Sequence, residues 1–269
     1  MGGHGCETTG VTASAKEGFL AAGRELLQRI ETTQREALED ASRICADAIA
    51  AGGLVHTFGT GHSRIPVEEL FPRYGSYPGF HPIVELSMTF HTQVVGANGQ
   101  RQAMFIERVE GLAAQILANF ELVPPDALLV FSAGGLTAVP IEMAIGARER
   151  GLPVIAVTSV ANARASQPTH STGTRLIDHA DVVVDLCTPP GDALIELEGI
   201  DTPVAPGTTL AAVAIANEIK TRTALALAEN GALPPVLTSA ALVGADRSAE
   251  LFDEAYAEHA RRARRTLRG

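Results

Sequence analysis

The sequence lacks tryptophan, has only three cysteines among its 269 residues, and contains no stretch approaching the ~20 apolar residues that span a bilayer. Cys6, Cys45 and Cys187 are odd in number and show no CxxC spacing. Neither a disulfide framework nor a zinc knuckle is therefore indicated, and a reducing cytoplasm fits. The first ten residues lack the apolar core of a signal peptide, so we expect no membrane partner.

Basic residues are also scarce. The chain has 21 Lys and Arg against 31 Asp and Glu, which gives a formal net charge of -10. This balance argues against sequence-independent binding to nucleic acid or anionic membranes, because both attract positive surfaces. Five arginines lie in the last nine residues. We expect this basic tail to be the frayed, solvated end of a C-terminal helix, where cations suit the helix dipole.

The pattern of apolar residues predicts an α/β fold. Short β-branched runs alternate with longer Ala, Leu and Glu segments, which indicates a parallel sheet of about five strands with helices on both faces. The expected strands are LVHTF at 54–58, PIVEL at 82–86, ALLVFS at 127–132, VIAVTS at 154–159 and DVVVDL at 181–186.

Helical spacing of apolar residues from Phe19 to Ala50 predicts one long helix or two stacked helices. A strongly helical segment, TTLAAVAIANEIKTRTALALAENG, ends at Gly231. No repeat or low-complexity linker divides the chain. We therefore expect a helical N-terminal extension at 1–51, one domain at 52–245, and a C-terminal helix with a basic tail at 246–269.

Two of the expected strands run directly into glycine- and hydroxyl-rich loops. These are Gly59-Thr60-Gly61-His62-Ser63 and the segment from Ser132 to Thr137, SAGGLT. Ligands bind at the carboxyl ends of parallel strands, where glycines admit close backbone N–H groups and hydroxyls hold phosphate. One such loop alone is equally well explained as a tight turn with a capping serine. Two loops favour a phosphate-ester site, and neither has the Walker or dinucleotide pattern.

These loops and the segments around them make the chain resemble the SIS (sugar isomerase) superfamily from about residue 54 to 244. The segments that carry the resemblance are GTGHSRIPVEELFPRYG, SAGGLTAVPIEMAIGARERGLPVIAVTS, HSTGTRLIDHADVVVDL and GDALIELEGI. The resemblance implies a flavodoxin-like sheet, a phosphosugar ligand, and a homodimer or homotetramer with the site near the subunit interface. Gly134 departs from the family pattern, which has a second serine there. The residues expected to hold the sugar phosphate are Gly59, Thr60, Gly61, His62, Ser63, Ser132, Gly134, Gly135, Thr137, Ser159 and Thr208.

Isomerisation of such a sugar needs a base that moves a proton between adjacent carbons and a group that moves the oxygen proton. The acids we favour are Glu69, after the first loop, and Glu110, in the segment ERVEG that also contains Glu107. For the oxygen proton we expect His91 or His170. Each candidate has a structural alternative: a first-turn helix acid, a solvated helix face, or a hydrogen-bonded histidine.

The favoured function is aldose-ketose isomerisation of a phosphorylated sugar or amino sugar through an enediol. A non-catalytic phosphosugar sensor, a related lyase or etherase, and an inert fold with a helical dimerisation arm stay open as alternatives. No segment has the form of a helix-turn-helix with a basic recognition helix, so we expect no nucleic-acid partner. Histidines are numerous, but no HxxxH or HExxH pattern is present, so we expect no metal and no cofactor.

Overall fold

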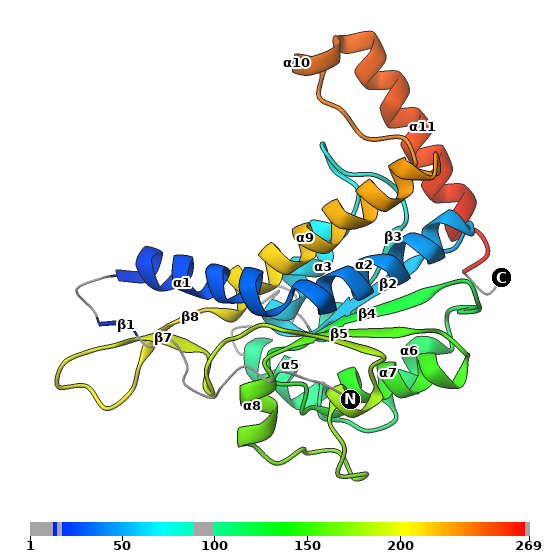
Figure 1. Cartoon of the computed structure of the whole chain (residues 1–269). Coiled ribbons are helices and arrows are strands. Elements are labelled where there is room, and N and C mark those ends of the chain that lie inside the picture. Colours follow the sequence, from blue (N-terminus) through cyan, green and yellow to red (C-terminus); the bar gives the residue numbers. More distant parts are fainter. Residues whose placement is uncertain (1–12, 15–17, 89–98, 267–269) are drawn as a thin grey trace.

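A computed structural model describes residues 13–14, 18–88 and 99–266 and contains the predicted parallel sheet (Figure 1). The strand order is β3-β2-β4-β5-β6, and every neighbouring pair is parallel. This is the flavodoxin-like order, so the prediction of five strands is confirmed. The strands are β2 (Val55–Gly59), β3 (Phe80–Ile83), β4 (Ala127–Phe131), β5 (Val154–Thr158) and β6 (Val182–Asp185).

Helices cover both faces of this sheet, as predicted (Figure 1). Strand side chains alternate between two apolar clusters, so Leu129 belongs to one and its neighbour Leu128 to the other. Helices α1 (Gly18–Thr33), α2 (Arg35–Ala50), α3 (Arg64–Leu70) and α9 (Thr208–Glu229) contribute to the first cluster. Helices α6 (Leu112–Leu117) and α7 (Ala138–Glu149) build the second. Helices α5 (Gly99–Ile106) and α8 (Val160–Ala165) lie on that same side (Figure 1).

The N-terminal helical segment consists of two helices that meet at Gln34. Before this point the Thr32 and Thr33 hydroxyls donate to carbonyls of the preceding turn, a pattern that weakens helix continuation. The side chain of Gln34 is buried, and its Oε1 accepts the Asp185 N–H at 2.9 Å. The break between α1 and α2 therefore lies where the chain is tied to the end of β6.

A second, smaller sheet was not predicted. It joins β1 (Ala13–Ser14), β7 (Ala193–Glu196) and β8 (Val204–Pro206) in the order β1-β7-β8. The β7 and β8 strands form an antiparallel pair that leads directly into α9. The short length of these strands explains why apolar alternation in the sequence did not reveal them.

Two C-terminal helices, α10 (Ala240–Val243) and α11 (Ala245–Ala263), project from the body (Figure 1). The expectation of a fully solvated basic tail is wrong for two arginines. Arg262 is buried and donates to the Ile49 and Gly53 carbonyls, each at 2.8 Å. Arg265 pairs with the buried carboxylate of Asp126, just before β4. The buried guanidinium of Arg262 and the partly exposed one of Arg265 each find oxygen acceptors near the amino ends of the strands.

A histidine cluster lies at the same end of the sheet. His56 on β2 places its Nδ1 3.1 Å from Nδ1 of His81 on β3, and its Nε2 3.3 Å from Asp126 Oδ2. Burial of His81, together with the charges of His56 and His259, lowers its pKa from 6.5 to about 4, although Asp126 opposes the shift. His81 is therefore neutral in the folded protein at pH 5 to 6.

We expect the free energy of unfolding to decrease as the pH falls from 6.5 to about 4, because the unfolded chain protonates His81 in this range while the folded chain does not. The full shift corresponds to about 3 kcal/mol. Urea denaturation across this range should show a shallower pH dependence for His81→Asn than for the wild-type chain. Parallel pH curves for the two proteins would contradict this assignment.

Candidate functional site

The sheet reverses its strand order between β2 and β4, so the loops that follow these strands leave toward opposite faces. A cavity of about 620 Å³ lies between them. It is lined by Thr60, Gly61, His62, Ser63, Met104, Glu107, Arg108, Ser132, Ala133, Gly134, Gly135, Leu136, Thr137, Asn162, Ser166, Gln167, Thr169, Asp192, Pro206, Thr208 and Thr209.

The first loop turns sharply at the end of β2. A short 3-10 turn, η1 (Gly61–Ser63), follows Thr60, and the Ser63 N–H donates to the Thr60 carbonyl at 3.0 Å. The turn passes so close to Gly59 that a Cβ there would lie 2.2 Å from the Ser63 carbonyl oxygen. Glycine at position 59 is thus required for the loop to fold back over the strand end.

The second loop is held by hydrogen bonds of its own. Ser132 Oγ accepts the Gly135 N–H at 3.0 Å, and Gly135 adopts a positive φ of 61°. Asn162, on α8, approaches the loop from the side: a Cβ on Gly134 would lie 2.4 Å from Asn162 Nδ2. The amide of Asn162 therefore lies close to the space that a side chain at position 134 would enter.

Glu107 brings a carboxylate to this cavity. The Thr60 hydroxyl donates to Glu107 Oε2 at 2.6 Å. Burial raises the pKa of Glu107, although the hydrogen bond from Thr60 and the charge of Arg108 oppose the shift. A carboxyl group with a raised pKa in a cavity has the protonation behaviour that general acid-base catalysis uses.

Glu110 lies three residues further along but points elsewhere. Helix α5 ends at Ile106, and the chain turns before α6 starts after Gly111, which has a positive φ of 86°. The Ser171 hydroxyl and N–H each donate to the Glu110 carboxylate at 2.6 Å, and these bonds lower its pKa. Glu110 is therefore not among the residues that line the cavity.

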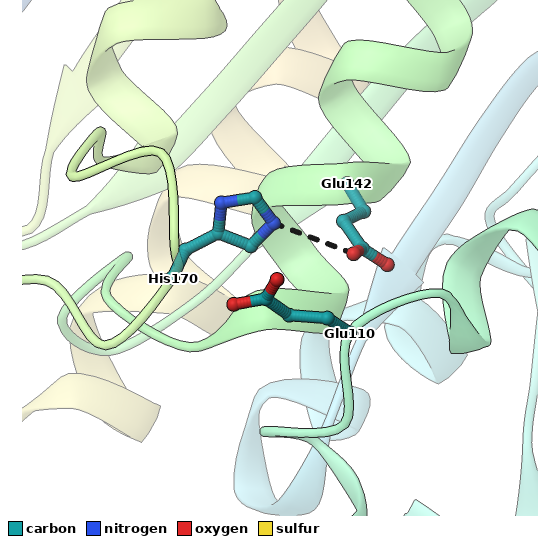
Figure 2. A group of neighbouring side chains, drawn as sticks. All are labelled: Glu110, Glu142 and His170. Atoms are coloured by element: carbon teal, nitrogen blue, oxygen red, sulfur yellow. Dashed lines mark hydrogen bonds and ion pairs between the residues drawn. The ribbon is translucent and has the colours of Figure 1, made fainter.

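Glu110, Glu142 and His170 point toward one another beside the cavity (Figure 2). His170 Nε2 lies 3.3 Å from Glu142 Oε1, and its Nδ1 lies 2.7 Å from the Thr172 hydroxyl. The three residues each offer a ligand atom within 4.8 Å of the others, so the group could hold a metal ion. Glu142 also accepts the Gly111 N–H at 2.8 Å. The group thus ties the segment after Thr169, a residue of the cavity wall, to α7 and the turn before α6.

Asp192 organises the opposite wall. Its Oδ1 accepts the Thr208 N–H at 2.7 Å, the Thr208 hydroxyl at 2.5 Å and the Gly207 N–H at 3.1 Å. These bonds satisfy donors at the start of α9. Asp192 holds a positive φ of 72° in this position. The small sheet therefore serves to deliver a capping carboxylate to α9 at the edge of the cavity.

Most residues expected to hold a sugar phosphate line this cavity. They are Thr60, Gly61, His62, Ser63, Ser132, Gly134, Gly135, Thr137 and Thr208. Gly59 lies just behind the first loop. Ser159 caps α8 instead: its hydroxyl donates to the Thr188 carbonyl at 2.7 Å and accepts the Asn162 N–H at 3.2 Å.

The expected catalytic residues do not gather here. Glu69 faces α9, where it accepts a hydrogen bond from Asn217 at 3.3 Å and its Oε1 lies 3.9 Å from Lys220 Nζ. It also accepts a hydrogen bond at 3.0 Å from Arg73, just after α3. It lines a separate cavity of about 440 Å³. His170 is buried against Glu142, and His91 lies outside the described residues.

Sequence reasoning missed Glu107, Asn162 and Asp192 as site residues. Glu107 belongs to the segment ERVEG, where a continuous helix would place Glu107 and Glu110 on one face. In the structure α5 ends at Ile106, and the break separates the two acids. Asn162 and Asp192 follow β5 and precede β7, so their positions depend on contacts between segments distant in the sequence.

Gly59→Ala should distort the first loop and lower the free energy of unfolding by about 1–3 kcal/mol, because backbone atoms must move to admit the methyl group. Gly134→Ala is the matched control. Its methyl group meets the end of the Asn162 side chain, which can rotate away. Chemical denaturation of the two variants measures the free energy of unfolding of each. A larger loss for Gly134→Ala than for Gly59→Ala would contradict this explanation.

The SIS domain family profile matches residues 18–159, which include α1 and α2. A UPF0309 protein of Streptomyces coelicolor is 35% identical over 223 residues, 82% of this chain and 86% of that protein. A UPF0309 protein of Geobacillus kaustophilus is 31% identical over 234 residues, 87% of this chain and 91% of that protein.

Among solved structures, phosphoheptose isomerase GmhA from Neisseria gonorrhoeae aligns with a TM-score of 0.47 at 15% identity, covering 78% of this chain and 95% of that chain. Across the part of the chain that the structure describes, we find no helix with the length and apolar character needed to cross a lipid bilayer. The family match, together with the identity to the UPF0309 proteins, shows that the chain belongs to the SIS domain family.

Proposed function

We propose that this chain binds a phosphorylated sugar or amino sugar in the cavity between β2 and β4 and isomerises it through an enediol. The observation that carries the proposal is the carboxyl group of Glu107, which has a raised pKa and is bonded to Thr60 of the glycine-rich loop. Membership in the SIS domain family supports a phosphosugar as the ligand.

The phosphate group is expected between the two loops. Ser63, Ser132 and Thr137 bring hydroxyls to the cavity, and the glycines let backbone N–H groups approach an anion. Arg108 adds a cation to the cavity wall. This arrangement would hold the phosphate mainly by hydrogen bonds and leave the carbonyl end of the sugar near Glu107.

Glu107 is the base in this proposal, in place of Glu69 and Glu110. As a carboxylate it would take a proton from the carbon next to the carbonyl group, and as the acid it would return that proton to the neighbouring carbon of the enediol. The oxygen proton must also move between the two oxygens. His62 lines the cavity and is the histidine that the structure offers for this transfer, whereas His170 is bonded to Glu142.

The related lyase or etherase reaction starts with the same proton abstraction, so the products distinguish it from isomerisation. A sensor would bind the sugar phosphate without moving the proton. A homodimer or homotetramer in a reducing cytoplasm, with the site near a subunit interface, stays a prediction from the family resemblance.

Sugar phosphates should raise the melting temperature of the protein, while the unphosphorylated parent sugars and nucleotides should not. A ligand at ~100 times its dissociation constant adds about 2.7 kcal/mol of stability. Ser63→Ala should reduce this shift, because it removes a hydroxyl from the cavity. Ser239→Ala, at the start of α10, is the control and should leave the shift unchanged. Equal shifts with and without phosphate on the sugar would refute the proposed phosphate site.

Glu107→Gln should keep binding but reduce proton transfer by about 10²–10⁴-fold, the usual contribution of a general base. Deuterium incorporation from heavy water at the carbon next to the carbonyl group measures this step for each sugar phosphate that binds. Glu69→Gln and Glu110→Gln are matched controls that should retain exchange. Loss of exchange in a control but not in Glu107→Gln would overturn the assignment, and binding without any exchange in the wild-type chain would favour a sensor.

A further inference from the structure

Helix α11 has a charged face, a buried face and an apolar face that is partly exposed. Ser248, Ala255 and Arg262, spaced by seven residues, are buried against the body. The neighbouring face carries an apolar stripe that is partly exposed: Phe252 is 41% exposed and Tyr256 40% exposed, and their stacked rings have centroids 4.5 Å apart. The stripe consists of Ala245, Ala249, Phe252, Tyr256, Ala260 and Ala263.

The helix is held rigidly while this stripe faces outward. Arg262 and Arg265 anchor its C-terminal half to the body, and Ser248 Oγ donates to the Thr238 carbonyl at 2.7 Å in its N-terminal half. These contacts hold α11 in the position in which it projects from the body (Figure 1). A preorganised surface loses less conformational freedom when it binds a partner.

We propose that the α11 stripe binds the same stripe of a second copy of this chain, with the two helices antiparallel about a twofold axis near Glu254. The sequence of the stripe is self-complementary in this direction. Phe252 lies opposite Tyr256 of the partner subunit and Ala245 opposite Ala263 of the partner subunit, while Ala249 and Ala260 of the partner subunit are neighbours offset by one residue. A twofold interface requires this reciprocity, because the same surface serves both copies.

The charges beside the stripe select the same direction. The N-terminal half of α11 is mostly acidic, with Asp246, Glu250, Asp253 and Glu254, and its C-terminal end is mostly basic. Antiparallel pairing places Asp246 near Arg264 of the partner subunit at both ends of the contact. Parallel pairing would place like charges together, which opposes association.

Helix α10 enlarges the apolar surface. Leu242 is 80% exposed and Val243 39% exposed, just before the start of α11. A 19-residue helix is about 28 Å long, so the stripe and α10 together offer an extended contact. The contact lies at the amino ends of the strands, where Arg265 meets Asp126, and the cavity lies at their carboxyl ends. The pairing thus leaves the cavity open and is separate from the subunit contact expected near the site.

Sedimentation velocity of the full chain tests the association. The wild-type chain should sediment as a dimer or a larger even-numbered assembly. The Phe252→Glu/Tyr256→Glu variant should lose the α11 contact and sediment as a species of half that mass, with an unchanged circular dichroism spectrum. Ile200→Glu, at a residue 56% exposed before β8, is the control and should assemble normally. A monomeric wild-type chain, or assembly unchanged in the double variant, would overturn the proposal.

Charge reversal separates loss of the contact from loss of the fold. Asp246→Arg and Arg264→Asp should each raise the dissociation constant about tenfold, because each places like charges at two symmetry-related contacts. Combining them should restore association, since the opposite charges face each other again. Failure of the combined variant to recover, while it remains folded, would refute the antiparallel register.

Disulfide trapping tests the register directly. The background chain carries Cys6→Ser, and its other two cysteines, Cys45 and Cys187, are buried. Ala249→Cys combined with Ala260→Cys should form a covalent dimer on oxidation. Either substitution alone should not, because the antiparallel helices separate equivalent positions by about 15 Å at 1.5 Å per residue. Efficient self-linking of Ala249→Cys alone would show a parallel pairing and overturn the proposal.

Discussion

The reversal of strand order between β2 and β4 is the constraint on which the candidate site depends. Because the connections from these two strands leave toward opposite faces, a cavity remains between the loops at their carboxyl ends. Two loops fill its margins, and Glu107 reaches it from the segment that precedes β4. The first loop folds back so close to the end of β2 that position 59 must be glycine. The turn of the second loop gives Gly135 a positive φ.

The main sheet could be predicted from sequence because its central strands β2, β4 and β5 are buried on both faces. Such strands appear as short, continuous apolar runs followed by glycine and hydroxyl residues, as at the end of β2 and β4. The positions of the two loops followed from this pattern. Helix α9 was also evident, since it is apolar around most of its circumference and ends before Gly231.

The acidic residues could not be placed in the same way. Glu107 and Glu110 are three residues apart, yet a turn of the chain separates their carboxylates, and only Glu107 meets Thr60. Glu69 follows the first loop closely, yet its side chain turns toward Lys220 on α9. In both cases the direction of the side chain is determined by contacts between distant segments, which spacing along the sequence does not reveal.

Two buried carboxylates at opposite ends of the sheet show how local donors determine what such a group can do. Burial alone would raise the pKa of Asp126, but hydrogen bonds from His56 and the Leu54 N–H, with the charge of Arg265, lower it. Glu107 accepts a hydrogen bond from Thr60, and burial dominates, so its pKa is raised. The lowered pKa of Asp126 favours its ionised form, which anchors Arg265 after α11, whereas the raised pKa of Glu107 favours its protonated form more than in a free glutamate. The amino ends of the strands thus hold the ionised carboxylate that anchors the segment after α11, and the carboxyl ends hold the carboxyl group with the raised pKa.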